Sequence, residues 1–219
     1  KGDLHDIGNY RPICLLSVVY KLFTRVIPNR FDRILDEGQP CEQAGFRKGF
    51  STMDHIHTIT RLTEASQEYK KPLCPTFIVL QKAFHSIEIG TVMEALGSQG
   101  VPIQYIKIPR ELYKNFTTKI SPFYNDINVD VKRGVRQGDT ISPKLLTATL
   151  QNVMLTLEWD GMGKKIDGRQ IHYLRFADDI VLITPDIDQA ERMLADFDKA
   201  CGKIGLRLNL KKTMFMKNG

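Results

Sequence analysis

Residues 173–183 constrain the fold more than any other part of the chain. They place two adjacent carboxylates, Asp178 and Asp179, between two apolar segments of strand-forming residues. Burying ionised groups without a partner is costly, so we expect a strand, a tight turn that holds both carboxylates at the edge of a sheet, and a second strand. Carboxylates held in this way can bind a hard cation such as Mg²⁺. An ordinary Asp-Asp turn without a ligand is the alternative, and these residues alone do not decide between the two.

Helical and strand patterns are interleaved along the rest of the chain, which favours an α+β fold. Apolar residues recur at helical spacing over 17–36, where Pro28 should kink or split the helix. Asn125 and Asp126 suit the turn of a hairpin over 117–132. The remaining expectations are a loop over 38–50, a helix capped by Ser51 and Thr52, a strand over 76–80, helices over 87–98, 143–157 and 188–204, and a last pair of strands.

Composition limits the class of protein and of partner. The chain is 42% hydrophobic and 26% charged, which is ordinary for a globular protein, and no apolar run is long enough for a membrane span. Lysine and arginine exceed aspartate and glutamate by 31 to 25, which favours an anionic partner, nucleic acid first. The four cysteines form no C-x-x-C pair, and the spacing of His55 and His57 makes a poor metal pair. Reduced thiols fit an intracellular protein, in the cytoplasm and nucleus.

Two glycine-containing segments can contact phosphate or bases. In residues 134–143 a flexible loop leads into a helix that starts at Pro143, so backbone N–H groups and Gln137 can approach a phosphate or a base edge. In residues 43–48 a basic loop carries Arg47, which can clamp a phosphate in a bidentate way. The alternatives are an ordinary helix entry and a solvated arginine.

In combination and order, these segments resemble the reverse transcriptase of non-LTR (LINE-type) retrotransposons over nearly the whole chain. The motifs that carry the resemblance are NYRPICLLS at 9–17, QAGFR with STMD at 43–54, RQGD with SP at 136–143, FADD at 176–179 and NLKKT at 209–213. The resemblance implies a right-hand polymerase, here fingers and palm, with an antiparallel palm sheet and helices packed on one face. We expect fingers at 1–72 and 113–133 and palm at 73–112 and 134–219, in a fragment that lacks the family's thumb and endonuclease.

The activity that the resemblance implies is RNA-directed DNA synthesis. A primer 3′-hydroxyl attacks the α-phosphate of a deoxynucleoside triphosphate on an RNA template, pyrophosphate leaves, and two Mg²⁺ ions assist the displacement. The residues carried over by motif are the metal ligands Asp178 and Asp179, Lys212 near the triphosphate, Arg47, Arg136, Gln137 and Gly138 at template or nucleotide, and Phe84 under the sugar. Phe84 also suits plain core packing.

The chain departs from this pattern at a metal ligand. Val79 stands where the family has a metal-bridging aspartate, and His85 stands where a second acidic residue is usual. Valine offers no oxygen lone pair. On an extended strand His85 would lie about 20 Å further along, and imidazole suits Mg²⁺ poorly. Losing such a stabiliser costs at least roughly 10²–10³ in rate.

We therefore expect an intact fold with an impaired polymerase site, or a catalytically inactive nucleic-acid-binding remnant. A purely structural α+β domain is a third possibility. Pro109 also falls within a segment that the family folds as a helix, where a central proline should interrupt it.

Overall fold

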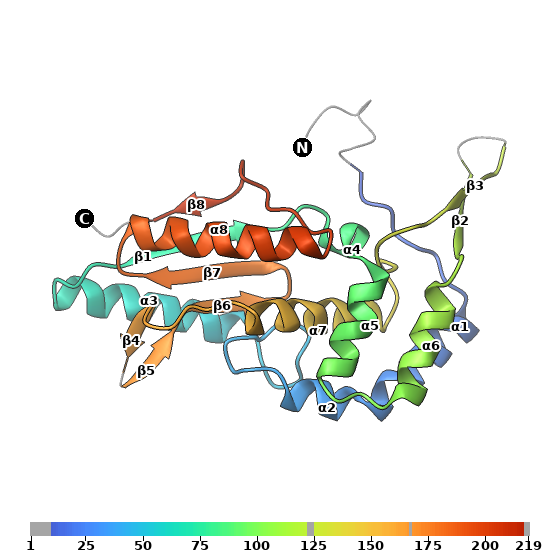
Figure 1. The fold of residues 1–219 in the computed structure, drawn as a ribbon, viewed down its shortest axis with the longest axis horizontal. Coiled ribbons are helices and arrows are strands. Elements are labelled where there is room, and N and C mark those ends of the chain that lie inside the picture. Colours follow the sequence, from blue (N-terminus) through green and yellow to red (C-terminus); the bar gives the residue numbers. More distant parts are fainter. Residues whose placement is uncertain (1–9, 122–124, 167, 217–219) are drawn as a thin grey trace.

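A four-stranded antiparallel sheet occupies the left half of the protein as drawn in Figure 1. The computed structural model describes residues 10–121, 125–166 and 168–216. The strand order in the sheet is β6 (Tyr173–Phe176), β7 (Asp179–Thr184), β1 (Cys74–Val79) and β8 (Met214–Phe215). The long β1–β7 pairing begins with Cys74 opposite Thr184 and ends with Val79 opposite Asp179. The expected strand, acidic turn and strand are therefore confirmed, and they join a neighbouring strand at the sheet's centre.

Helices cover this sheet and build the core beside it. The amphipathic helix α8 (Ile187–Lys203) contacts β7 and β1 and also packs against α7 (Ser142–Leu155). Ten of the fourteen residues of α7 are buried, because α5 (Ile89–Ser98) also packs against it. The core is thus continuous from the sheet through α8 and α7 to α5. The antiparallel sheet and its packed helices match the expected α+β architecture.

A second group of elements extends beyond the sheet, at the right of Figure 1. Helix α6 (Ile103–Tyr113) contacts α5, and the hairpin of β2 (Thr117–Ile120) and β3 (Ile127–Asp130) protrudes from it. The remaining elements of the chain are α1 (Val18–Val26), η2 (Pro28–Arg30), α2 (Asp32–Glu37), α3 (Thr52–Glu68), α4 (Ala83–Ser86) and the hairpin of β4 (Lys164–Ile166) and β5 (Arg169–Ile171). Of these, α3 and the β4–β5 hairpin lie at the left of Figure 1, on the side of the sheet.

Proline affects two helices differently. Pro28 ends one helical segment and starts another, so the expected split of residues 17–36 is confirmed. Pro109 lies within α6, which continues to Tyr113, so the expected interruption is wrong. Pro109 is buried, and burial of its apolar ring offsets the hydrogen bond that the helix loses.

The last pair of strands is also absent from the described residues. Only β8 forms there, and it pairs with β1. Residues 209–213 instead fold into a turn, in which the Lys212 and Thr213 amides donate to the Asn209 carbonyl at 2.9 and 3.0 Å. Before that turn, a single bridge joins Leu208 to Leu80.

Helix α1 is amphipathic in the unusual sense that its polar side faces the protein. The Tyr20 hydroxyl donates to Asp139 Oδ2 at 2.9 Å, and Thr24 Oγ1 lies 2.9 Å from Thr140 Oγ1. The apolar side faces outward, with Val18 82% exposed. Hydrogen bonds therefore dock this helix. No helix within the described ranges is both long and apolar enough to cross a membrane.

We predict that truncating two helical leucines has very different effects. Leu145 of α7 is fully buried, and Leu22 of α1 is 63% exposed. Leu145→Ala should lower the free energy of unfolding by about 2–5 kcal/mol, because it leaves a cavity. Leu22→Ala should change it by less than about 0.5 kcal/mol. Urea unfolding followed by circular dichroism measures both, and similar losses would contradict this description of α1.

Candidate functional site

The two aspartates lie at a tight hairpin turn. Phe176 pairs with Asp179, so Ala177 and Asp178 form the loop. Ala177 adopts a φ of +61°, a left-handed conformation that costs a non-glycine residue about 1–2 kcal/mol. Gly45 packs directly against this turn, because a Cβ built there would lie 2.9 Å from the Phe176 carbonyl carbon. The 38–50 loop therefore packs against the backbone of the turn through Gly45. Asp178 is half-buried and Asp179 is exposed.

Val79 faces this turn from the neighbouring strand. It is the direct cross-strand partner of Asp179, and such partners have Cβ atoms about 4.5–5.5 Å apart on one face of the sheet. The expectation that residue 79 lies beside the acidic turn is confirmed. Val79 presents hydrocarbon where a carboxylate would complete a cation site. Within the described part of the chain, no group of three or more His, Cys, Asp or Glu residues can hold a metal, so the donors present do not fit a two-metal centre.

Electrostatics at the turn reflect the two neighbouring carboxylates. Desolvation by the surrounding protein atoms and the charge of Asp178 raise the pKa of Asp179, although part of its side chain reaches solvent, and Arg11 opposes this shift. The ionised form of Asp179 is therefore disfavoured, which a bound cation would relieve. Sequence reasoning did not single out Arg11, although it belongs to the motif at 9–17.

Lys212 belongs to a turn that is anchored to Val79. The Asn209 amide donates to the Val79 carbonyl at 2.8 Å, and the Lys212 amide donates to the Asn209 carbonyl. The side chain of Lys212 is exposed. The structure therefore brings this turn to the end of β1 that carries Val79 and faces Asp179.

The loop over 134–139 is joined to α4. The Val135 amide donates to the Phe84 carbonyl at 2.6 Å, and His85 Nε2 lies 2.9 Å from Gln137 Oε1. His85 lies in α4, so the expectation that it extends along a strand is wrong, because Lys82, at a φ of +44°, turns the chain into that helix. Phe84 packs partly buried against the core, so its core-packing role is confirmed and a sugar contact stays a prediction.

Arg136 sits in an aromatic cage. Its guanidinium lies 4.4 Å from the Phe116 ring centre and about 5 Å from those of Tyr20 and Tyr113. It donates to the Tyr20 hydroxyl and, at 2.9 Å, to the Leu112 carbonyl. Burial raises the pKa of Tyr20, and it raises that of Tyr113 to about 12, so both phenols stay neutral.

Gly138 lies close to Cys14, and its neighbour Arg136 lines a groove together with Cys14. A Cβ at Gly138 would lie 3.2 Å from the Cys14 carbonyl oxygen, and its φ is +99°. Residues 12–17 and 116–121 form the two sides of this groove, which has a volume of about 660 Å³. Gly138 thus permits the close approach of its own loop to residues 13 and 14, which form part of one side of this groove.

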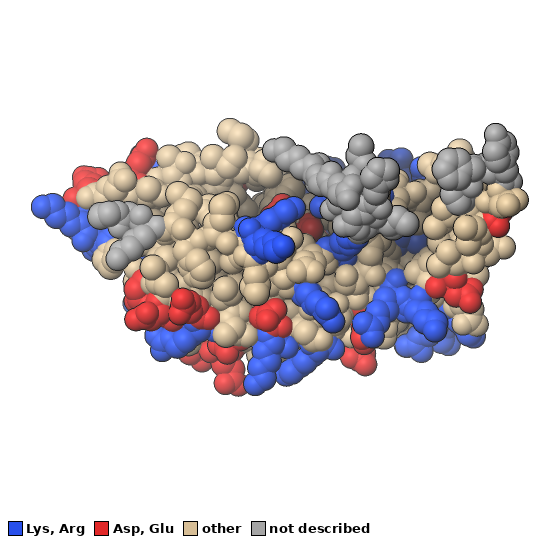
Figure 2. All heavy atoms as spheres, turned by 90° about the horizontal axis from the view of Figure 1, so that it is seen from above, with Lys and Arg blue, Asp and Glu red and all other residues tan. Residues whose placement is uncertain are grey.

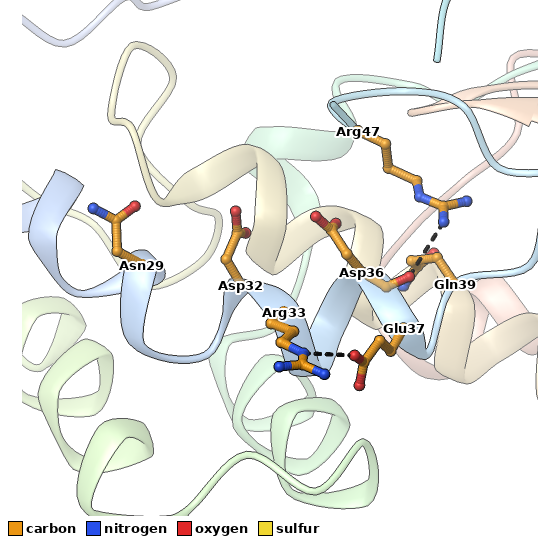
Figure 3. A pocket seen from close by; sticks show the side chains of 7 residues that line it. All are labelled: Asn29, Asp32, Arg33, Asp36, Glu37, Gln39 and Arg47. Carbon is orange, nitrogen blue, oxygen red and sulfur yellow. Dashed lines mark hydrogen bonds and ion pairs between the residues drawn. The ribbon is translucent and has the colours of Figure 1, made fainter. Parts of the chain in front are cut away.

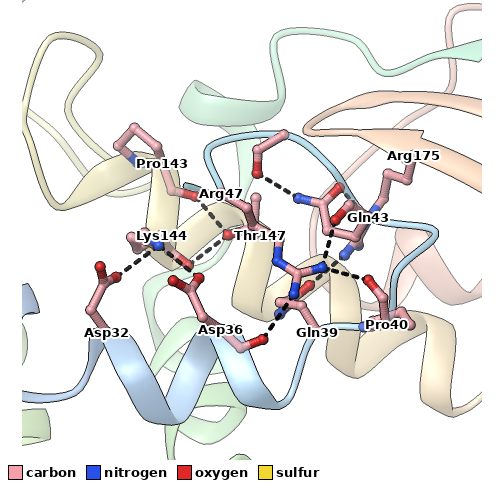
Figure 4. Close-up of polar contacts among 11 residues, drawn as sticks. Asp32, Asp36, Gln39, Pro40, Gln43, Arg47, Pro143, Lys144, Thr147 and Arg175 are labelled. Carbon is pink, nitrogen blue, oxygen red and sulfur yellow. Dashed lines mark hydrogen bonds and ion pairs between the residues drawn. The ribbon is translucent and has the colours of Figure 1, made fainter. Parts of the chain in front are cut away.

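Arg47 is engaged with backbone carbonyls (Figure 4). It donates to the carbonyls of Pro40 at 2.7 Å, Gln43 at 2.9 Å and Asp36 at 3.2 Å. These bonds hold the 38–50 loop in shape, which the resemblance did not indicate. A direct phosphate contact by Arg47 stays a prediction.

Arg175, which sequence reasoning missed, links this loop to the hairpin (Figure 4). It is fully buried one residue before Phe176. Its guanidinium donates to the side-chain oxygens of Gln39 at 2.9 Å, Gln43 at 3.3 Å and Gln151 at 3.2 Å. Burial lowers the pKa of Arg175 to about 10. The available signal was an arginine within an otherwise apolar strand.

A hollow along α2 is lined mostly by charged residues of that helix, and Gln39 and Arg47 also line it (Figure 3). Its volume is about 740 Å³. Lys144 Nζ lies 2.8 Å from both Asp32 and Asp36, and Arg33 pairs with Glu37 at 2.7 Å. Arg47 is a third cation at this hollow, so three basic side chains balance the three carboxylates and the hollow offers no net charge to a cation.

The predicted residues therefore fall into three places. Asp178, Asp179, Val79 and the turn of Lys212 meet at the end of the sheet, and Arg47 holds the loop behind the acidic turn. The third group lies along α4 and the loop beside it, and comprises Phe84, Arg136, Gln137 and Gly138. Figure 2 shows basic and acidic side chains interspersed on the face it draws, with no single basic stripe.

Comparison with known proteins gives a consistent family. The family model described as reverse transcriptase (RNA-dependent DNA polymerase) matches residues 1–219. A Pol polyprotein from the retrotransposable element R2 of Popillia japonica is 27% identical over 97% of this chain and 30% of its own length. A probable RNA-directed DNA polymerase from transposon BS of Drosophila melanogaster is also 27% identical, over 94% of this chain and 23% of its own. The chain thus spans less than a third of these relatives.

The fold is similar to solved telomerase structures. Apo telomerase from Candida tropicalis, truncated of its C-terminal domain, superposes with a TM-score of 0.67 at 13% identity, over 91% of this chain and 41% of that one. A telomerase from Candida albicans gives a TM-score of 0.60 over 90% of this chain and 35% of that one, at 12% identity. These similarities support the right-hand polymerase fold.

We predict that Gly45→Ala disrupts the packing of the 38–50 loop against the acidic turn. The added methyl would overlap the backbone of Phe176 and Ala177, so the variant should lose more than about 2 kcal/mol of unfolding free energy. Gly90→Ala in α5 is the matched control, because no atom lies near its Cβ position; it should be neutral or stabilising by up to about 1 kcal/mol. Equal stability of the two variants in chemical denaturation would contradict the close contact.

Proposed function

Because the chain belongs to the reverse transcriptase family, we propose that it binds an RNA template with a DNA primer but extends the primer poorly. The observation that carries this proposal is the register of β1 and β7, in which Val79 stands opposite Asp179. Reverse transcriptases use divalent metal ions, and phosphoryl-transfer enzymes of this kind clamp the attacking and leaving oxygens between two.

The impairment follows from the donor set. Asp178 and Asp179 supply carboxylate oxygens from one turn, and the neighbouring strand supplies only the methyl groups of Val79. A ligand shared by both ions is missing from this arrangement, so we expect nucleotide addition to fall by at least roughly 10²–10³. We propose no catalytic step through a metal in this chain.

Binding to nucleic acid depends on different groups. Arg11 acts on Asp179 electrostatically, and the backbone turn that carries Lys212 is bonded to the Val79 carbonyl, so we expect both cations to reach a strand bound at the acidic turn. Both can neutralise phosphates that approach it. We also propose that Lys212 contacts the triphosphate of a deoxynucleotide, with Gln137 and Phe84 nearer its base and sugar.

The second candidate is a remnant that binds nucleic acid without any catalysis. The same observation favours it, because Val79 removes an oxygen ligand while leaving the fold intact. Incorporation of a labelled deoxynucleotide on a primed RNA template separates the two candidates. Slow, template-directed addition indicates an impaired polymerase, and no addition indicates an inactive remnant. Robust extension by the unaltered chain would refute the impairment in both.

We predict that Val79→Asp creates a Mg²⁺ site. The new carboxylate would lie beside those of Asp178 and Asp179, and repulsion among the three should make the melting temperature of the metal-free variant lower than that of the unaltered protein. Mg²⁺ at ten times its dissociation constant should then stabilise the variant by about 1.4 kcal/mol. Thermal unfolding and isothermal titration calorimetry with and without Mg²⁺ measure both effects.

The matched control is Val79→Asn, which has the same shape without the charge. It should respond to Mg²⁺ as weakly as the unaltered protein. Equal Mg²⁺ affinity in Val79→Asp and the unaltered protein would contradict the assignment of residue 79 as the lost ligand.

We predict that primer–template binding depends steeply on salt. The logarithm of affinity should fall linearly with the logarithm of salt concentration, by about 0.9 for each phosphate neutralised. Arg11→Gln should reduce the slope by about one, whereas Lys199→Gln, at an exposed position of α8, should leave it unchanged. Fluorescence anisotropy gives the slopes, and affinity that does not respond to salt would favour a purely structural domain.

A further inference from the structure

Phe46 is an exposed aromatic residue in a strained backbone conformation beside the acidic turn. Its φ is +59°, a region that is uncommon for a bulky residue. Its side chain is 45% exposed. It lies next to Gly45, which packs against the Phe176–Ala177 backbone. Folding gains little from this arrangement, since Phe46 neither joins the core nor relaxes its backbone.

The residues on both sides fix Phe46 in this position. The Ala44 amide donates to the Arg175 carbonyl at 3.0 Å, and Ala44 is buried. After Phe46, the guanidinium of Arg47 donates to two carbonyls of the same loop, Pro40 and Gln43, and to the Asp36 carbonyl of α2. Strain of this kind persists only where the surroundings over-determine it, and it gathers at ligand-binding positions.

The neighbourhood of Phe46 has the composition of a surface for single-stranded nucleic acid. Phe50 is 38% exposed, and the Arg47 guanidinium stacks 4.2 Å from its ring centre. Lys48 is exposed between them. Alternating aromatic and basic side chains bind single strands by stacking on bases while attracting phosphates.

We propose that Phe46 is a stacking platform for one unpaired base of the template strand, next to the acidic turn. This inference rests on the proposed binding of a primed template. An unpaired base is the fitting ligand because it has a free face, whereas bases inside a duplex already stack on their neighbours.

Stacking predicts an effect that depends on one base. Base–aromatic stacking contributes enough that Phe46→Ala should weaken binding of a primer–template with a single-stranded template overhang by roughly five- to a hundred-fold. Phe46→Tyr should bind within about twofold of the unaltered protein. Phe46→Leu, which is apolar but not aromatic, should lose nearly as much as Phe46→Ala.

The test is a double-mutant cycle measured by fluorescence anisotropy on the full chain. A single abasic residue is placed in turn at each overhang position. At the stacked position, the abasic template should bind the unaltered protein as weakly as Phe46→Ala binds the intact template, and combining the two changes should add no further loss. Phe23→Ala, at a phenylalanine of α1 that is 49% exposed, should show no effect.

Two results would overturn the inference while leaving the proposed function intact. One is tight binding by the unaltered protein together with Phe46→Ala within twofold of it. The other is a loss that is the same for intact and abasic templates at every position, as a protein-docking or folding role would give. Absence of salt-dependent binding by the unaltered protein would instead overturn the proposed function, and this inference with it.

Discussion

The buried guanidinium of Arg175 is the interaction on which the arrangement of the site depends. It bonds to glutamines from the 38–50 loop and from α7, and it lies directly before the acidic turn. Three neutral side-chain oxygens therefore fix the hairpin against two other parts of the chain. Nε and Nη2 of this guanidinium are paired, whereas Nη1 is buried with no partner among the described residues. Losing the remaining bonds would leave further buried donors unpaired, which is costly.

Much of the fold was predictable from local pattern. The acidic hairpin, the split at Pro28 and the amphipathic helix α8 follow from periodicity and backbone restrictions. The prediction that Pro109 interrupts its helix was wrong, because burial of the proline ring outweighs the loss of one helical hydrogen bond. The prediction that His85 lies along a strand was wrong, because Lys82 adopts a left-handed backbone conformation that turns the chain into α4. The sequence does not mark this conformation, because Lys82 is not a glycine. The register of Val79 with Asp179 required the family motif, since periodicity does not set the pairing of distant strands.

The candidate site was predictable as a set of motifs, but less so as contacts. The motifs place Asp178, Asp179 and Lys212, and the structure brings their segments together beside Val79. Arg47 illustrates the limit, because its guanidinium is used by the loop itself. Arg175 and Gly45 were missed because their roles arise from long-range packing. A sequence motif does not show which of its polar side chains form hydrogen bonds within the motif and are therefore unavailable to a ligand.

The outward apolar side of α1 has a consequence for how this polypeptide behaves in solution. The outward side of α1 exposes a row of apolar side chains to solvent, Val18, Val19 and Leu22. A contiguous exposed apolar patch of this kind promotes association with other apolar surfaces. The protein should therefore tend to aggregate at high concentration. Replacing these exposed apolar residues of α1 with polar ones should reduce aggregation without undocking the helix, because the hydrogen bonds that dock it are on its opposite side.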